Sequence, residues 1–155
     1  MERAIKILGI ILLLGASCSE EVTPKPFIFS KLFTGEHNKT WKVKFFEETL
    51  DGNVVDRFTI GCVNDDQYIF YANPERSMDF KSGSGKCFNP AEPSLVTDTW
   101  SYQSGTATLT MLLPIFADIP LPFTVRKVNE DDLELEIFFD DNASYRIHFD
   151  ATHEE

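Results

Sequence analysis

The sequence predicts an all-β protein, folded as an antiparallel up-and-down barrel of eight or nine strands with a short N-terminal helix. Apolar and polar residues alternate along most of the chain, as they do in strands with one buried face. Clusters of Gly, Asn, Asp, Ser and Pro recur about every ten residues, which is the spacing of hairpin turns. A closed barrel is favoured because an open sheet of hairpins would expose its edge strands.

The first 17 residues are predicted to be a secretory signal rather than part of the fold. Arg3 and Lys6 precede an apolar run at residues 7–14, and small residues follow at 15–17. This order of charged, apolar and small residues is typical of signal peptides. The run is shorter than the roughly 20 residues that a membrane-spanning helix needs. A buried strand or helix is the alternative, which the charge order disfavours.

Cys18 follows these small residues directly, and the junction resembles the lipobox of bacterial lipoproteins. The resemblance implies cleavage before Cys18 and acylation of that residue, which would give stable membrane anchoring. Residues 18–26 would then be an extended tether. Ser19, followed by two glutamates, resembles the signals of lipoproteins that are sent to the outer membrane and its surface. We therefore expect an outer-membrane protein facing the periplasm or, slightly favoured, the cell surface.

Composition narrows the classes of partner. The chain has 155 residues and a formal net charge of −11, so binding to nucleic acid is disfavoured. Residues 27–155 are enough for one domain with its own core. The acidic clusters at residues 65–66, 130–132 and 140–142 lack the alternating oxygen ligands and glycine of a calcium loop. Neither a metal nor a cofactor is predicted, and the oligomeric state is left open.

Cys62 and Cys87 are predicted to form a disulfide. With Cys18 assigned to the anchor, they remain as a pair in an oxidising compartment. A zinc site would need histidines near both thiols, and the three histidines are scattered along the chain.

The expected elements follow in order after the tether. A helix over residues 27–33 ends at Gly35. Alternation such as Trp41-Lys42-Val43-Lys44-Phe45 marks the strands, and turn signals separate them. The strands are predicted at residues 40–49, 53–60, 66–72, 76–81, 95–103, 106–113, 122–128, 132–139 and 143–150.

Residues 112–122 form an unusual segment. Its three prolines prevent a regular paired strand, yet it is too apolar for an ordinary loop. It is interpreted as a flap over a barrel mouth, an exposed patch for a partner, or a loop folded back onto the barrel end. Its candidate portal or interaction residues are Leu113, Ile115, Phe116 and Ile119.

Three groups of short motifs follow one another along the chain. They are Leu32-x-x-Gly35 before Trp41-Lys42-Val43; Cys62, Asp65-Asp66-x-Tyr68-x-Phe70, Cys87 and Thr99-Trp100-Ser101; and Phe123-x-Val125 before Asp132-Leu133-x-Leu135. Taken in this order, the motifs resemble the lipocalin-like domains of bacterial lipoproteins. The resemblance covers residues 32–149 and implies a lipocalin-like barrel at residues 27–155.

The predicted function is that of a membrane-anchored lipoprotein that binds a small apolar ligand inside the barrel or at its mouth. An eight-stranded barrel is just wide enough to hold one small ligand or to be filled by its own side chains. The alternative is a cell-surface module that contacts a protein or a glycan through its loops. No enzyme is predicted, since the chain has no nucleophile elbow, phosphate loop or metal-spaced histidine pair. The residues expected to line the interior are Trp41, Phe45, Phe70, Trp100, Tyr102, Met111 and Tyr145.

Overall fold

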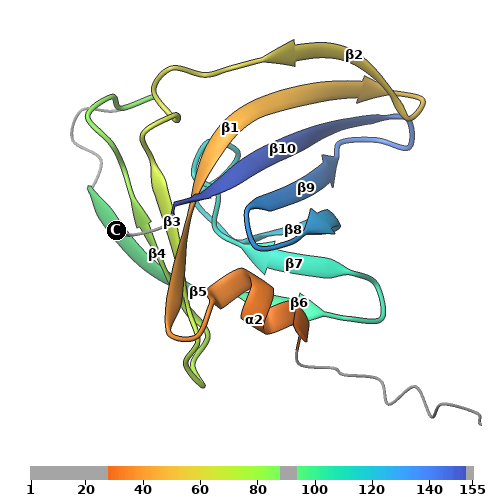
Figure 1. Cartoon of the computed structure of the whole chain (residues 1–155). Coiled ribbons are helices and arrows are strands. Elements are labelled where there is room, and N and C mark those ends of the chain that lie inside the picture. Colours follow the sequence, from red (N-terminus) through yellow and green to blue (C-terminus); the bar gives the residue numbers. More distant parts are fainter. Residues whose placement is uncertain (1–27, 88–93, 153–155) are drawn as a thin grey trace, which may run out of the picture.

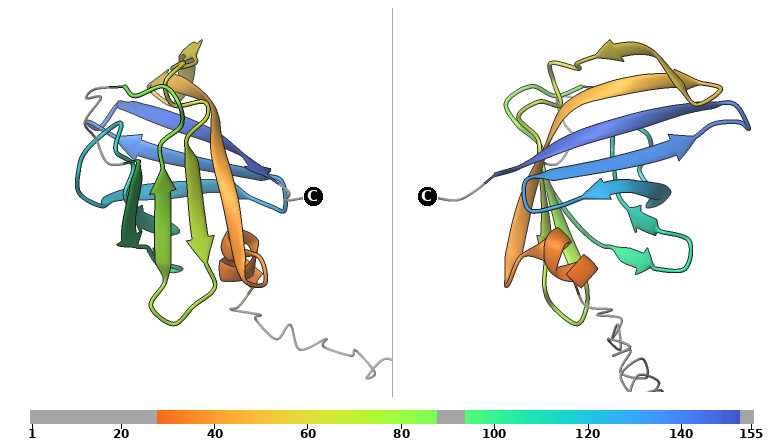
Figure 2. Two further views of the ribbon diagram at one scale, coloured as in Figure 1. Left: turned by 90° about the vertical axis from the view of Figure 1, so that its left-hand side faces the viewer. Right: turned by 45° about the vertical axis from the view of Figure 1, so that its right-hand side comes forward.

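The computed structural model describes residues 28–87 and 94–152, which form a nearly closed antiparallel barrel with one short helix (Figures 1 and 2). The predicted fold class is therefore confirmed. The predicted signal and tether, and with them Cys18, lie outside the described residues.

Every predicted strand has an observed counterpart, and the predicted strand at 95–103 is divided in two at Trp100. The helix ends before Gly35, whose positive φ of 63° suits glycine at the end of a helix. The elements are α2 (Ile28–Thr34), β1 (Asn38–Leu50), β2 (Asn53–Phe58), β3 (Gln67–Tyr71), β4 (Ser77–Lys81), β5 (Leu95–Thr99), β6 (Ser101–Gln103), β7 (Thr108–Met111), β8 (Leu121–Val128), β9 (Asp132–Phe138) and β10 (Ala143–Thr152).

Two pairs of consecutive strands each occupy a single strand position in the wall of the barrel. Such a position is here called a stave. Residues 46–50 of β1 pair with β2 and residues 38–41 pair with β3, so β2 and β3 follow one another along the same edge. β5 pairs with β4, and β6 pairs with β7, with only Trp100 between β5 and β6. Counting each pair as one stave reduces the ten described strands to eight. The pairing of β1 with β10 joins the first stave to the last.

The two ends of the barrel differ because successive staves run in opposite directions. One end, here called the helix end, carries α2 and the turns between β3 and β4, β6 and β7, and β8 and β9 (Figure 2). The other, the loop end, carries the β1–β2 and β9–β10 hairpins, residues 82–87 after β4, and residues 112–120. Residues 59–66, between β2 and β3, also lie at the loop end.

The helix end is filled by side chains. Trp41 is fully buried, and its Nε1 donates a hydrogen bond to the carbonyl oxygen of Phe33 in α2 at 3.0 Å. The ring of Phe33 in turn lies 5.9 Å from that of Phe70 and 6.2 Å from that of Trp100. The helix therefore closes this end of the barrel with aromatic contacts.

A β-bulge determines the face on which Phe45 lies. The pairing of β1 with β10 shifts between Val43 and Phe45, so Lys44 is an extra residue. Phe45 then stacks on His148 on the outer face, with ring centroids 4.2 Å apart, and Phe46 takes the interior position. The prediction that Phe45 lines the interior is wrong, because strict alternation does not anticipate an inserted residue.

A row of alternating charges crosses the outer face. Arg57 lies opposite Glu47, Glu47 opposite Arg146, and Arg146 opposite Glu136, in strands β2, β1, β10 and β9. Both glutamates are buried. Glu47 accepts hydrogen bonds from Arg57, and Glu136 accepts hydrogen bonds from Arg146 and from Arg126. Charge-assisted hydrogen bonds thus join β2 to β1 and β10 to β9, and His148 of β10 lies 3.2 Å from the carboxylate of Glu47 in β1.

The surroundings of the two glutamates keep both carboxylates ionised. Burial raises the pKa of Glu136, but hydrogen bonds from Ser144, Arg126 and Arg146 outweigh it, so the pKa lies below the ordinary value. Burial likewise raises the pKa of Glu47, and hydrogen bonds from Arg57 and His148 outweigh it. The row should therefore stabilise the fold only while both carboxylates are charged.

We expect the free energy of unfolding to fall as pH drops through the lowered folded-state pKa values of Glu47 and Glu136. Both groups stabilise the fold fully above the ordinary glutamate pKa, and below it the unfolded chain binds more protons. Glu136→Gln should lower the free energy of unfolding near pH 7 by about 1–3 kcal/mol and reduce its acid dependence. Urea unfolding followed by tryptophan fluorescence at several pH values measures both effects.

The exposed Glu75→Gln is the matched control and should change neither quantity. An unchanged acid dependence in Glu136→Gln would contradict the assignment.

Candidate functional site

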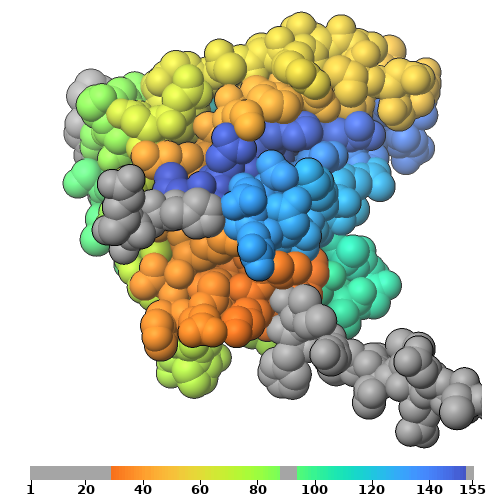
Figure 3. All heavy atoms as spheres, in the orientation of Figure 1, coloured from red at the N-terminus to blue at the C-terminus, as the bar shows by residue number. Residues whose placement is uncertain are grey.

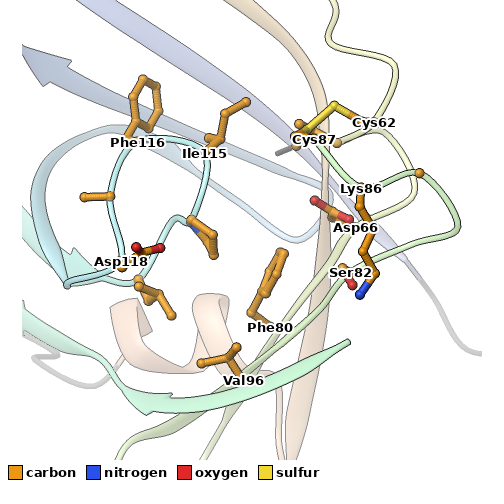
Figure 4. Close-up of a pocket in the computed structure, with 15 residues that line it drawn as sticks. Cys62, Asp66, Phe80, Ser82, Lys86, Cys87, Val96, Ile115, Phe116 and Asp118 are labelled. Carbon is orange, nitrogen blue, oxygen red and sulfur yellow. A yellow bond between two sulfur atoms is a disulfide. The ribbon is translucent and has the colours of Figure 1, made fainter. Parts of the chain in front are cut away.

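The loop end contains a cavity of about 520 Å³ (Figure 4). Three parts of the chain enclose it: the two segments that carry Cys62 and Cys87, the inner faces of β4 and β5 at Phe80 and Val96, and residues 112–118. Most of the lining is apolar. The cavity therefore lies between the barrel staves and the loops above them.

A disulfide holds one wall of this cavity. Cys62 and Cys87 are bonded, with their Cα atoms 5.2 Å apart, which confirms the predicted pairing. The bond joins the segment after β2 to the segment after β4. Val63, the next residue after Cys62, is buried and donates its backbone N–H to the carbonyl oxygen of Ile60 at 2.9 Å. The disulfide thus fixes two otherwise separate connections at the rim.

Residues 112–118 form the opposite wall and fold back over the barrel end. Leu113 is fully buried, and the backbone N–H of Phe116 donates to its carbonyl oxygen at 2.9 Å, which closes a tight turn. Ile115 and Phe116 are half-buried and line the cavity, whereas Ile119 is 63% exposed. Of the predicted portal residues, Leu113 belongs to the core, Ile115 and Phe116 to the cavity, and Ile119 to the surface.

Phe116 also contacts an aromatic cluster on its other side. This loop-end aromatic cluster comprises Phe46, Phe58, Phe116, Phe123, Phe139 and Tyr145. The ring of Phe116 stacks on that of Tyr145 at 6.1 Å and meets that of Phe46 edge-on at 6.4 Å. A movement of Phe116 would therefore change both the cavity and the aromatic contacts beside it.

Polar groups gather at one side of the cavity, beside the disulfide (Figure 4). This polar corner consists of Asp66, Ser82 and Lys86. Gln67 pairs with Lys81, so the positions of Asp66 and Ser82 are opposite one another at the next step of the ladder. Asp66 is 5% exposed, and its Oδ1 accepts a hydrogen bond from the backbone N–H of Gly83 at 2.8 Å.

Two hydroxyl groups in this region are buried without a hydrogen-bond partner among the described residues: Ser82 Oγ and the phenol oxygen of Tyr68. Burial raises the pKa of Tyr68 well above its ordinary value, and the charge of Asp66 raises it further. Tyr68 is therefore a neutral phenol. Buried hydroxyls are usually hydrogen-bonded, so these two hydroxyl groups have unused hydrogen-bonding capacity.

The residues that the sequence singled out for ligand contact lie elsewhere. Trp41, Phe70, Trp100 and Met111 belong to the filled core. Tyr102 stacks on Phe29, with ring centroids 3.6 Å apart. Tyr145 lies in the loop-end aromatic cluster, and Phe45 lies on the outer face. The structure does not bring these seven residues together around the cavity of Figure 4.

The sequence reasoning missed the polar corner and the floor of the cavity. Asp66 begins the strand predicted at residues 66–72 and was not among the candidate site residues, although it lies two residues before Tyr68 and so shares its face of the stave. Phe80 follows the same alternation in β4, two residues before Ser82. The alternation of side chains along each strand could have placed these residues on the inner face of the barrel. Only the strand register shows that Asp66 and Ser82 lie opposite one another.

The described residues contain no group of three or more His, Cys, Asp or Glu side chains that could hold a metal ion. No helix in residues 28–87 and 94–152 is long and apolar enough to cross a membrane.

No protein-family model, curated protein or solved structure matches this chain. The resemblance to lipocalin-like domains of lipoproteins therefore stays a prediction from the motifs.

We expect removal of the disulfide to destabilise the fold substantially. Replacing both Cys62 and Cys87 by Ala should lower the free energy of unfolding by about 3.5 kcal/mol, because the bond closes a 25-residue separation in the unfolded chain. Urea unfolding of the oxidised protein and of the double variant measures the difference. Adding a reductant should destabilise the unsubstituted protein to the same extent and leave the double variant unaffected; a loss below about 1 kcal/mol would contradict the expectation.

Proposed function

We propose that this protein is a lipid-anchored binding protein that holds a small apolar ligand in the loop-end cavity. The observation that carries the proposal is the cavity itself. Its volume of about 520 Å³ lies within the roughly 300–1,000 Å³ of typical small-molecule sites. Its lining is also of the usual kind, mostly apolar with a few polar groups that face inward.

Binding would be driven by burial of apolar surface. A ligand in the cavity would remove water from Phe80, Val96 and Ile115, and each Å² of apolar surface buried is worth roughly 25 cal/mol before the entropy of association is subtracted. Residues 112–118 provide the access route in this proposal. They are attached to the barrel through the buried Leu112 and Leu113 and through Phe116. Pro114 within the segment, and Pro120 after it, limit the number of conformations available to it.

The anchor and the cavity are at opposite ends of the barrel in this proposal. The described chain begins with α2 at the helix end, and the cavity lies at the loop end (Figures 1 and 4). A lipid on Cys18 would therefore attach on the helix side of the domain, and the loop end would be free to face away from the outer membrane.

The second candidate is a surface module that contacts a protein or a glycan, and one observation favours it. The β1–β2 and β9–β10 hairpins lie side by side, where the backbone N–H of Asp51 donates to the carbonyl oxygen of Asn142 (Figure 3). Five apolar side chains around these tips are 47–56% exposed: Leu50, Val54, Val55, Phe138 and Phe139. Exposed apolar surface of this kind is typical of interaction sites.

Ligand binding can be tested with the neutral fluorescent probe N-phenyl-1-naphthylamine. Ala117→Trp should fill the cavity and weaken binding of the probe by at least about tenfold, which is 1.4 kcal/mol. The matched control is Ile119→Trp, in the same segment but outside the cavity lining, and it should leave the affinity unchanged. Fluorescence titration measures both. Absence of probe binding to the unsubstituted protein, or equal effects of the two variants, would contradict the proposal and favour the surface module.

The anchor is tested by Cys18→Ser. Expressed in a Gram-negative host, the unsubstituted chain should incorporate a clickable fatty acid and sediment with the outer membrane. The variant should do neither, because no other cysteine follows the small residues at 15–17. Fatty-acid labelling of the variant equal to that of the unsubstituted chain would refute the assignment.

A further inference from the structure

We propose that the ligand carries a neutral hydroxyl group, which Ser82 and Asp66 hold at the polar corner of the cavity. The inference rests on the proposed function and adds the chemical class of the ligand: an apolar alcohol or phenol rather than a carboxylate or an amine.

The placement of the two side chains supports this reading. Asp66 extends the β3 stave and Ser82 extends the β4 stave, and the pairing of Gln67 with Lys81 sets them opposite each other. Both residues line the cavity, as does Phe80, whose side chain covers the floor next to them (Figure 4). A ligand with its apolar part against Phe80 would therefore place one end between an aspartate and a serine.

The hydroxyl of Ser82 is able to make a further hydrogen bond. Its Oγ is buried and has no hydrogen-bond partner among the described residues, although a hydroxyl in that position is normally paired. Asp66 offers carboxylate oxygens, which only accept hydrogen bonds, and a serine hydroxyl both donates and accepts. A ligand hydroxyl complements this pair, because it can donate to the carboxylate while accepting from Ser82.

The charges at the polar corner favour ionic ligands of neither sign. Asp66 would repel a carboxylate and Lys86 would attract it, and the reverse holds for an ammonium group. An ion would therefore lose its hydration with little net gain from these two charges, whereas the burial of a neutral hydroxyl is offset once both of its hydrogen bonds are made.

The test compares three ligands that share one alkyl chain. Decan-1-ol, decanoate and decylamine compete with N-phenyl-1-naphthylamine for the full-length protein carrying Cys18→Ser, oxidised so that the disulfide is formed. We expect the alcohol to displace the probe at the lowest concentration. Ser82→Ala should weaken the alcohol about three- to tenfold, as expected for the loss of one hydrogen bond, and leave the affinity for the probe unchanged.

Two further variants separate a specific contact from a general disturbance. Ser82→Thr retains a hydroxyl and should retain the preference for the alcohol. Ser101→Ala removes an exposed hydroxyl from β6 and should have no effect. Displacement by decanoate or decylamine as strong as that by the alcohol, or an unchanged alcohol affinity in Ser82→Ala, would overturn the inference while probe binding still supports the proposed function. Failure of the probe to bind would overturn both.

Discussion

The pairing of β1 with β10 is the interaction on which the rest of the barrel depends. β1 is the longest described strand, and it also pairs with β2 and β3, so one strand aligns three neighbours. The row of Arg57, Glu47, Arg146 and Glu136 reinforces this alignment on the outer face. Because β1 and β10 are the first and last strands, their contact forms only when nearly the whole chain is in place, which is characteristic of slowly folding β-barrels.

This closure leaves an interior that is used differently at its two ends. Aromatic side chains from α2, β1 and β3 fill the helix end, so the barrel has a packed core there. At the loop end, residues 59–66, 82–87 and 112–118 line the cavity together with Phe80 and Val96 of β4 and β5. The packed half supports the position of β3 and β4, from whose ends Asp66 and Ser82 reach the cavity. The polar groups thus lie just beyond the ends of β3 and β4, and the apolar lining comes both from strands, at Phe80 and Val96, and from residues 112–118.

Alternation and turn signals predicted the fold class and the place of each described strand, with β5 and β6 taken as one, because these depend on local pattern. The number of cysteines predicted the disulfide. Phe45 shows where local pattern fails, since a single inserted residue at Lys44 moves it to the outer face. The cavity could not be predicted for a related reason. Asp66 and Ser82 are separated by a whole hairpin, and strand register alone brings them together. Large aromatic residues such as Trp41 and Trp100 were candidates for ligand contact, yet they fill the core.

The disulfide at the rim of the cavity affects the stage of export at which the proposed binding site is complete. Its two thiols can pair only in an oxidising environment, and the bond they form holds a wall of the cavity. For a chain exported as proposed, the precursor in the cytosol would lack the Cys62–Cys87 disulfide, so this wall of the cavity would not yet be held in place. Maturation of the binding site would then coincide with arrival outside the cytoplasmic membrane, so that cargo is not taken up prematurely from the compartment in which the chain is made.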